Sequence, residues 1–599
     1  MQLYPVIYPS LNLDFANAKG FLDPRVTFTR ASTGTYYDGK TKVLAEQNLL
    51  TYSEQFDNSI WSKYNTTVTA NTTTAPDGTT TADSLIENTT NVIHSLDSSP
   101  FSTAGNFTSS IYLKANGRNF VRLYVSQISP NVNYTALFDL SLGTIVSTDA
   151  GVTSTITSVG NGWYRCTVSA LTVGTQVRIT VGLQNATGSI VAYTGDGVSG
   201  CYLWGAQLEQ RSASTAYNPT TTSTITNYIS QLLTAPINAP RFDYNPVTGE
   251  SLGLLIEQSS TNLLLQSGSI GTSPWATGAS TINTSVAIAP DGTQSASWLI
   301  YSSGGARIVQ AYTATSTSNI FSVYVKSTGL SGNWASSGAS LLFYNSTTST
   351  ALGNVPFSGA TFTAGGANAT STYVGNGWYR ISLYQSTGIS VGNTVIAYLY
   401  CDSANGSSGS LYCWGGQAES LAFPTSYIPT TSAQVTRAAD TANMTGTNFS
   451  SWYNQNQGTF FADYIANQSL PTTFSAGIFG CGPGGYASTN SSQLFLGSNQ
   501  IVGYYQPNGY PEIGLYANVK PLIGKIAMSY SLTLGTLVVN NSTVITQSGN
   551  FPNNGGINSI QLGTRDYNSN TNYLNGWIKK FAYYPQQITA SQSQSLTGS

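Results

Sequence analysis

The chain consists of short runs in which apolar and polar residues alternate, separated by turns rich in Gly, Asn, Ser and Thr. In the run "TQVRITVGL", Val177, Ile179, Val181 and Leu183 fall on one side of an extended backbone. Similar runs recur at a spacing of roughly 8 to 15 residues, and no stretch shows a convincing helical period of 3.6 residues. The pattern therefore predicts an all-β protein.

The hexapeptide GNGWYR occurs twice, at residues 160–165 and 375–380, each time after an extended run. Asn-Gly between two strands favours a type I′ turn, because both residues accept a positive φ at low cost. We predict a β-hairpin with one apolar face in each copy, with Trp163 and Trp378 on the opposite face. The predicted apolar face holds Tyr164, Cys166 and Val168 in the first copy, and Tyr379, Ile381 and Leu383 in the second.

The repetition extends well beyond the hexapeptide, at an offset of about 210 to 215 residues, which predicts two homologous domains. Cysteines differ between the copies, since Cys166 corresponds to Ile381 and Cys413 to Leu203, and this difference indicates packing rather than chemistry. The matching stretches are 48–61 with 262–275, 75–87 with 289–301, 110–117 with 322–329, and 203–220 with 413–430.

The pattern changes near the C-terminus, where "QGTFFADYIA" and "LNGWIKKFAYYPQQIT" are rich in strand-forming residues but GNGWYR is absent. The fold class we predict is an all-β, multi-domain β-sandwich in which each repeated domain is a two-sheet jelly roll. The predicted parts are an opening segment (1–47), a first jelly roll (48–222), a connector (223–262), a second jelly roll (263–432) and a third β-rich domain (433–599).

Charge is scarce: Asp, Glu, Lys and Arg make up 8% of the residues, the net charge is −2, and 40% of the residues are hydrophobic. Nucleic-acid binding requires clustered Lys and Arg, and the chain has no basic block. No apolar run is long enough to span a membrane, and the N-terminus does not resemble a secretory signal. We therefore expect synthesis in a cytosol, no nucleic-acid partner and no membrane insertion.

Several of these stretches resemble a known family. "NLLTYSEQFDNSIW", "APDGTTTADSL", GNGWYR and "WGAQLE" are similar to the carbohydrate-binding-module-like domains of bacteriophage virion proteins. "TSYIPTTSAQVTRAAD" with the C-terminal motifs resembles the concanavalin/laminin-G-like domain that often follows them. The resemblance implies a structural role in the virion, commonly in tail or fibre parts that face the host.

The chain departs from the family in the placement of two opening pieces, at residues 28–39 and 240–264. These pieces usually lie close together, whereas here the whole first module separates them. We infer that a module was duplicated into the opening segment, and we expect residues 223–262 to pack against residues 1–47. Residues 1–47 are also our prediction for virion attachment or oligomer contact.

Two glycine motifs match nucleotide-binding patterns without the required context. "GTYYDGKT" at residues 34–41 satisfies the P-loop expression, but its tyrosines and Asp38 would crowd the phosphate, and no α/β domain follows. "GCGPGG" at residues 480–485 precedes no helix. We predict no nucleotide binding at either position, and a loop between strands at residues 480–485.

Catalytic and metal chemistry also has weak support. His94 is the only histidine, and the five cysteines, an odd number, lack ligand spacing. Glu209 and Glu419 recur in the two copies and are glycosidase candidates, although we favour strand-end acids paired with Lys or Arg. We predict no cofactor, and calcium in the polar loop at residues 564–572 remains an alternative.

Sugar binding needs exposed aromatic rings and little charge, and this composition provides both. "GYYQPNGYPE" places Tyr504, Tyr505 and Tyr510 around a Pro-Asn-Gly turn, and we predict these three residues as the carbohydrate contact. Trp163 and Trp378, in contrast, fit a scaffold role shared by the two domains.

We therefore predict a non-enzymatic virion protein, a tail fibre or tail-associated adhesin, located on the exterior of the particle. Its predicted partners are other virion proteins, a host-surface glycan and further copies of itself, with a trimer as one option. A capsid-attached fibre or decoration protein, a purely structural tail component and a glycan-cleaving enzyme remain alternatives.

Overall fold

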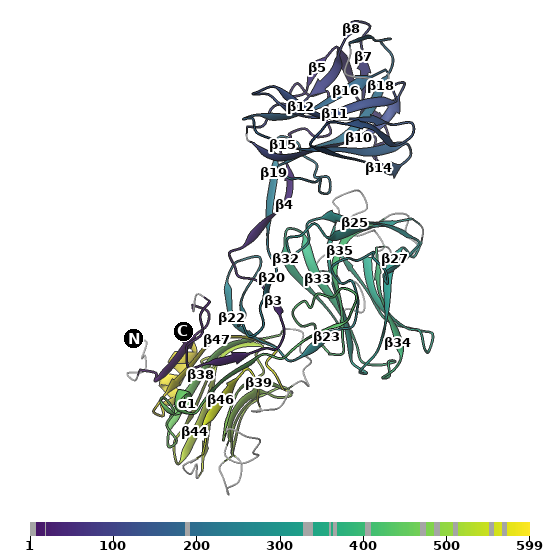
Figure 1. Ribbon diagram of the computed structural model, residues 1–599. Coiled ribbons are helices and arrows are strands. Elements are labelled where there is room, and N and C mark those ends of the chain that lie inside the picture. The colour runs from purple at the N-terminus through teal and green to yellow at the C-terminus, as the bar shows by residue number, and fades with distance from the viewer. Residues whose placement is uncertain are drawn as a thin grey trace.

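The computed structural model describes residues 8–17, 20–102, 104–185, 192–302, 304–327, 339–358, 361–362, 368–401, 409–467, 475–483, 491–506, 513–549, 556–565 and 572–598. Its architecture is three β-sandwiches in a row, as the alternating sequence pattern predicts (Figure 1). The two repeated domains, here called module 1 and module 2, lie above the C-terminal sandwich in this view, and both chain ends lie beside that sandwich.

Module 1 is a sandwich of two antiparallel sheets. The sheet that contains the GNGWYR hairpin, called the hairpin sheet, runs in the order β14 (Val152–Gly160), β15 (Trp163–Thr172), β10 (Gly105–Asn116), β18 (Gly200–Glu209), β7 (Ala82–Glu87) and β6 (Thr66–Thr73). The opposite sheet runs β13 (Thr144–Thr148), β12 (Val132–Asp139), β11 (Phe120–Gln127), β16 (Val177–Gln184), β9 (His94–Asp97) and β5 (Ser62–Tyr64). A small pair, β8 (Asn91–Val92) and β17 (Tyr193–Thr194), lies outside both sheets.

Module 2 repeats this topology strand for strand, which confirms that the duplicated stretches form the same fold twice. Its hairpin sheet runs β32 (Ala369–Gly375), β33 (Trp378–Gln385), β28 (Asn319–Ser327), β35 (Ser410–Glu419), β26 (Ala296–Tyr301) and β25 (Ser280–Ala287). Its opposite sheet runs β31 (Thr361–Phe362), β30 (Thr350–Ser358), β29 (Ala339–Asn345), β34 (Thr394–Tyr400), β27 (Arg307–Thr313) and β24 (Ala276–Gly278).

The C-terminal sandwich takes strands from distant parts of the chain. One sheet runs β21 (Phe242–Tyr244), β22 (Ser251–Ile256), β47 (Gly576–Tyr584), β38 (Gly458–Ala466), β43 (Ile523–Tyr530), β44 (Leu534–Val539) and β45 (Thr543–Ser548), with β1 (Leu11–Asp14) also paired to β47. The other runs β2 (Thr27–Thr29), β37 (Thr441–Thr445), β46 (Ser559–Leu562), β39 (Ala476–Gly482), β40 (Ser491–Leu496), β41 (Ile501–Gln506) and β42 (Ile513–Ala517). The helices of the described chain are α1 (Thr447–Ser450) and α2 (Ala590–Gly598).

The described part of the opening segment packs into the C-terminal sandwich, while its predicted role in virion attachment stays a prediction. Leu11 and Leu13 on β1 are at most 2% exposed and belong to the core of the C-terminal sandwich. Phe28 on β2 pairs with Ala442 and joins the same core. Since these apolar side chains are buried by residues more than 400 positions away, the described part of the segment is a structural component of the last domain.

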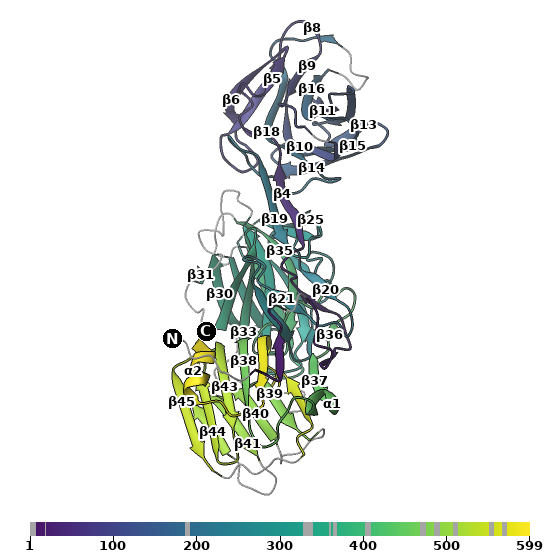
Figure 2. The same ribbon diagram turned by 90° about the vertical axis from the view of Figure 1, so that its left-hand side faces the viewer.

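A ribbon of two paired strands joins each module to the rest of the chain, and the ribbon of module 1 is visible below that module in Figure 2. Ribbon 1, β4 (Lys42–Asn48) with β19 (Ile225–Ser230), leads into and out of module 1, and β3 (Gly34–Tyr36) pairs with β20 (Leu233–Ala235) below it. Ribbon 2, β23 (Ser260–Asn262) with β36 (Val435–Arg437), does the same for module 2. The connector therefore pairs with the opening segment, as expected, and each module is an insertion between two paired strands.

A buried asparagine closes the base of each module in the same way. Asn48 is fully buried, and its Nδ2 donates to the carbonyls of Ala206 and Asn218 at 3.0 and 2.9 Å. Asn262 makes the matching bonds to the carbonyls of Gly416 and Ile428 at 3.1 and 2.9 Å. Both amides have satisfied donors, so these bonds stabilise the closed base at little desolvation cost.

The GNGWYR hairpin forms as predicted, with positive φ at Asn161 (53°) and Gly162 (77°) and again at Asn376 (47°) and Gly377 (77°). Its apolar face enters the core in both copies, where Cys166 and Ile381 are at most 1% exposed. The opposite face is not simply polar. Trp163 and Trp378 are at most 1% exposed, and each lies in a buried cluster that is separate from the main core of its module. This position fits the scaffold role predicted for them.

A buried ion cluster joins the opening segment, the connector and the chain that follows module 2. Asp440 accepts from Arg30 at 3.1 Å and from Arg241, and Glu257 accepts from Arg241 at 2.8 Å. Arg437 lies 3.6 Å from Glu257. Although burial opposes ionisation of Glu257, Arg437 and Arg241 lower its pKa to about 2. The cluster therefore fixes the strands on which module 2 is inserted.

Candidate functional site

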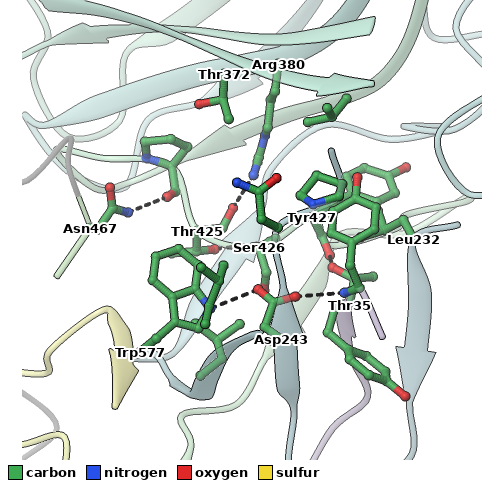
Figure 3. A pocket seen from close by; sticks show the side chains of 18 of the residues that line it. Thr35, Leu232, Asp243, Thr372, Arg380, Thr425, Ser426, Tyr427, Asn467 and Trp577 are labelled. Carbon is green, nitrogen blue, oxygen red and sulfur yellow. Dashed lines mark hydrogen bonds between the residues drawn. The ribbon is translucent and has the colours of Figure 1, made fainter. Parts of the chain in front are cut away.

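The hairpin sheets of the two modules line a matching pair of pockets. The junction pocket, of about 320 Å³, lies between the hairpin sheet of module 2, the connector and the C-terminal sandwich (Figure 3). The inter-module pocket, of about 520 Å³, lies between the hairpin sheet of module 1 and strands β25, β26 and β35 of module 2. Each module thus faces the next unit of the chain with the same sheet.

In the junction pocket, the polar groups are largely engaged with one another. Arg380 donates to the Thr425 carbonyl at 2.7 Å, and Asn467 donates to the Pro424 carbonyl at 3.0 Å (Figure 3). Arg380 also donates to the Ser322 hydroxyl at 3.0 Å. The Asn467 bond joins module 2 to the C-terminal sandwich, whereas both Arg380 bonds lie within module 2 and leave Arg380 fewer donors for a ligand.

Asp243 is one of two buried acids that line the junction pocket, the other being Glu257 of the ion cluster. Oδ1 of Asp243 accepts from the Tyr37 N–H at 2.8 Å, and its Oδ2 accepts from Trp577 Nε1 at 2.9 Å (Figure 3). Burial raises the pKa of Asp243 to about 6, against the opposing effect of these two donors. Because the three residues come from β21, the opening segment and β47, Asp243 ties three parts of the chain together.

The inter-module pocket has a different character. A ladder of hydroxyls runs across β14 and β15, where Thr153 pairs with Ser169 and Thr155 with Thr167. Arg165 lies beside this ladder, as Arg380 does in module 2. The described lining residues include no Asp, Glu or Lys, so Arg165 is their single formal charge.

A third surface lies on the outer face of the opposite sheet of module 2. Ala397 and Leu399 of β34 point into the core, so the alternate residues Tyr398 and Tyr400 face outward and are partly exposed. Their rings stack at 14°, with centroids 5.6 Å apart. The Tyr344 ring lies 6.2 Å from Tyr398, and the Arg307 guanidinium lies 5.8 Å above the Tyr398 ring. We call these four residues the tyrosine patch.

The predicted carbohydrate contact does not form as a set. Tyr505 is 2% exposed and packs 5.7 Å from Tyr530 in the core of the C-terminal sandwich, so its ring has no free face for a sugar. Tyr504 alternates with it on β41 and is partly exposed. Tyr510 lies outside the described residues. Strand alternation separates Tyr504 from Tyr505, because neighbours on a strand face opposite sides of the sheet.

The recurring glutamates serve the loop that follows their strand. Glu209 is fully buried and accepts from the Thr215 N–H at 2.9 Å, and Glu419 accepts from the Thr425 N–H at 3.1 Å. Each also accepts from the hydroxyl of its threonine. Burial raises the pKa of Glu209. The sequence predicted a Lys or Arg partner for these glutamates. In module 1 that partner is Arg211, which forms a long ion pair with Glu209 at 3.8 Å.

The other sequence candidates also occupy structural positions. His94 is fully buried, with its ring nitrogens 2.9 and 3.2 Å from the carbonyls of Asn65 and Tyr193. All five cysteines are buried. The P-loop-like stretch forms β3 and a turn in which Asp38 accepts from the Thr41 N–H at 2.7 Å, and it then enters β4.

The proposed calcium loop lies mostly outside the described residues. The loop predicted at residues 480–485 is wrong for its first half, because residues 480–482 form the end of β39 and pair with β46, while residues 484–485 lie outside the described residues. Within the described residues, no three His, Cys, Asp or Glu side chains gather as a metal site. The described helices include none with the length and apolarity to cross a membrane.

The tyrosine patch was not anticipated from the sequence. Its signal was present in "VIAYLY", where tyrosines alternate with apolar residues at the spacing of one strand face. Tyr344 comes from a separate strand, and Arg307 from a third, so only the sheet order brings the four residues together.

Comparisons with known proteins give likenesses of fold only. No family model and no curated protein matches the sequence. Among solved structures, the chain is similar to the CBM40 of a Ruminococcus gnavus IT-sialidase bound to α2,3-sialyllactose, with 14% identity over 25% of this chain and 88% of that one and a TM-score of 0.22. It is similar to the CBM22-1–CBM22-2 tandem of Paenibacillus barcinonensis Xyn10C, with 9% identity over 63% and 98% and a TM-score of 0.18. It is also similar to domains LG4-5 of the mouse laminin α1 chain, with 8% identity over 57% and 92% and a TM-score of 0.16.

Proposed function

We propose that the protein is a non-enzymatic adhesin on the exterior of a bacteriophage virion, where it binds host-surface carbohydrate through module 2. The virion assignment rests on the sequence resemblance of the modules and of the C-terminal domain. The carbohydrate assignment rests on one observation, the tyrosine patch.

The patch has the chemistry that a saccharide requires. The C–H groups on one face of a sugar ring pack on aromatic rings, and the Tyr344, Tyr398 and Tyr400 side chains are all partly exposed. Tyrosine hydroxyls and the Arg307 guanidinium supply hydrogen-bond partners for the ring hydroxyls. The patch therefore replaces the predicted contact at Tyr504, Tyr505 and Tyr510.

The binding test compares the full-length protein with a Tyr398→Ala/Tyr400→Ala variant, on host cells before and after their surface polysaccharide is stripped. We expect stripping to abolish binding, and the variant to bind roughly tenfold more weakly, since each stacked ring contributes about 0.5–1.5 kcal/mol. Tyr384→Ala, which removes a partly exposed tyrosine from the other sheet of the same module, is the matched control.

Two results would contradict this proposal. Equal binding by the double variant and the control would remove the patch from recognition, and no binding by the wild-type protein would favour a structural tail component. Antibody labelling of intact particles tests the location: labelling on the capsid rather than the tail would favour a capsid-attached fibre or decoration protein. Release of reducing sugars from the polysaccharide would instead favour a glycan-cleaving enzyme.

A further inference from the structure

The inter-module pocket carries a second inference, which is independent of the tyrosine patch. We propose that this pocket binds an acidic saccharide, with Arg165 recognising the carboxylate and the Ser/Thr ladder of module 1 binding the ring hydroxyls. Both modules would contact the ligand, because both line the pocket.

The size and the lining of the pocket support a sugar ligand. Its volume of about 520 Å³ falls within the range of roughly 300–1,000 Å³ typical of small-molecule sites. Thr153, Thr155 and Thr157 on β14 are exposed on one wall. Trp298 and Tyr412, with ring centroids 6.3 Å apart, form part of the other wall. Hydroxyls opposite aromatic rings suit a molecule that has both polar edges and apolar faces.

The charge of the pocket selects an acidic sugar over a neutral one. Arg165 is the single formal charge among the described lining residues. Its guanidinium donates to the Ser110 hydroxyl at 3.0 Å and lies 5.6 Å above the Tyr112 ring. Glu209 interacts with this charge but is fully buried behind the lining and bonded to Thr215, so it does not face the pocket.

The comparison with the junction pocket identifies which arginine is available. Arg380 makes the same two contacts, with Ser322 and with the Tyr324 ring, and in addition donates to the Thr425 carbonyl. Arg165 has no corresponding bond to Thr215, the residue that matches Thr425. A carboxylate in the inter-module pocket would supply the acceptor that Thr425 supplies in module 2.

The pocket lies where the two modules also contact each other directly. In addition to ribbon 1, Gln294 of module 2 donates to the Ser214 carbonyl of module 1 at 2.8 Å, and Lys326 forms an ion pair with Glu46 of the ribbon. A saccharide bound to both walls would add contacts between the same two modules.

The experiment is calorimetric titration of the full-length protein with a hexuronic acid disaccharide and with its neutral hexose counterpart. We expect the acidic disaccharide to bind at least tenfold more tightly than the neutral one, and Arg165→Gln to remove this preference. Arg165→Lys keeps the charge and should retain an intermediate preference. Arg380→Gln is the matched control and should leave it unchanged.

The outcomes separate this proposal from the proposed function. The Tyr398→Ala/Tyr400→Ala variant should bind the acidic disaccharide as the wild-type protein does, even where its binding to host cells is lost. Equal affinity for the two disaccharides, no detectable binding of either, or a preference that survives Arg165→Gln would each overturn the assignment of the inter-module pocket.

Discussion

Module 1 and module 2 share one scaffold but present different outer faces. The scaffold residues agree in detail: the closing asparagines Asn48 and Asn262, the buried tryptophans Trp163 and Trp378, and the order of strands in both sheets. Each module also has a Trp-Gly pair in which the glycine, Gly205 or Gly415, has a positive φ. Because glycine has no Cβ, a tyrosine ring packs closely against it, as Tyr112 does at Gly205.

The outer faces of the opposite sheets differ at aligned positions. "VGTQVRIT" in module 1 corresponds to "VGNTVIAY" in module 2, so Thr180 and Gly182 occupy the positions of Tyr398 and Tyr400. Module 1 instead carries an ion pair there, between Arg178 and Asp97 at 2.9 Å. The comparison shows that core and base residues are shared by the two modules, whereas the outward positions of their strands carry different side chains.

The largest expected effect on stability comes from replacing the two tryptophans of the shared scaffold. We expect Trp163→Ala and Trp378→Ala each to lower the free energy of unfolding by about 3–5 kcal/mol, because each leaves a cavity in a buried cluster. Trp378 also packs in a cluster with Leu232 of the connector, so its loss should destabilise more than one unit. Denaturant unfolding and scanning calorimetry of the two variants measure these changes. A change below about 1 kcal/mol for either variant would contradict a shared scaffold role.

A buried acid of module 1, Asp83, has no counterpart at the matching position of module 2 and should give module 1 an additional pH dependence. Asp83 accepts from the N–H groups of Phe56 and Asn71, both at 2.9 Å, whereas the matching Ser297 donates to the Ile270 carbonyl. Burial raises the pKa of Asp83 from 3.8 to about 6. Since the folded state then holds the proton more tightly than the unfolded chain, the contribution of Asp83 to stability is largest below about pH 4 and falls as the pH rises through 6.

The free energy of unfolding falls by up to about 3 kcal/mol, because each unit of difference between the folded and unfolded pKa corresponds to about 1.4 kcal/mol. Comparing melting temperatures of the wild-type protein and Asp83→Ser between pH 4 and 7 measures it, because other groups titrate equally in both. Parallel pH profiles for the two proteins would contradict the effect. The corresponding Ser297→Ala variant should follow the wild-type profile.

The smallest expected effect is a gain of binding in module 1. Thr180→Tyr and Gly182→Tyr, combined with Tyr124→Leu, should create a second tyrosine patch. Tyr124 must be shortened because a Cβ on Gly182 would lie 3.2 Å from its ring. In the Tyr398→Ala/Tyr400→Ala background, we expect recovery of about 1 kcal/mol of binding, measured by titration with the host polysaccharide. A correctly folded graft that recovers no binding would show that the two rings alone are insufficient.

Local patterns in the chain were sufficient for the elements and for the repeat. Alternation identified Val177, Ile179, Val181 and Leu183 as one core face, and all four are at most 2% exposed. The Asn-Gly turns formed because their φ values depend on two adjacent residues. Neither result requires information from elsewhere in the chain.

The candidate site was predictable only in its chemistry. A tyrosine-rich, weakly charged surface was expected, but it was placed on the C-terminal domain, where Tyr505 is buried. Whether a strand residue faces solvent depends on which side of its sheet is covered by the rest of the fold. The position of Tyr344 beside Tyr398 also depends on the pairing of β29 with β34.

Duplication, strand alternation and turn chemistry are properties of neighbouring residues, so the amino-acid sequence alone determined the all-β class, the two modules and their hairpins. Long-range pairing decided the rest. Leu11 lies opposite Tyr583, and Arg30 reaches Asp440 at 3.1 Å. Such contacts form because burying apolar strands and pairing buried charges stabilises the folded chain, and their free energy depends on residues that local patterns do not connect.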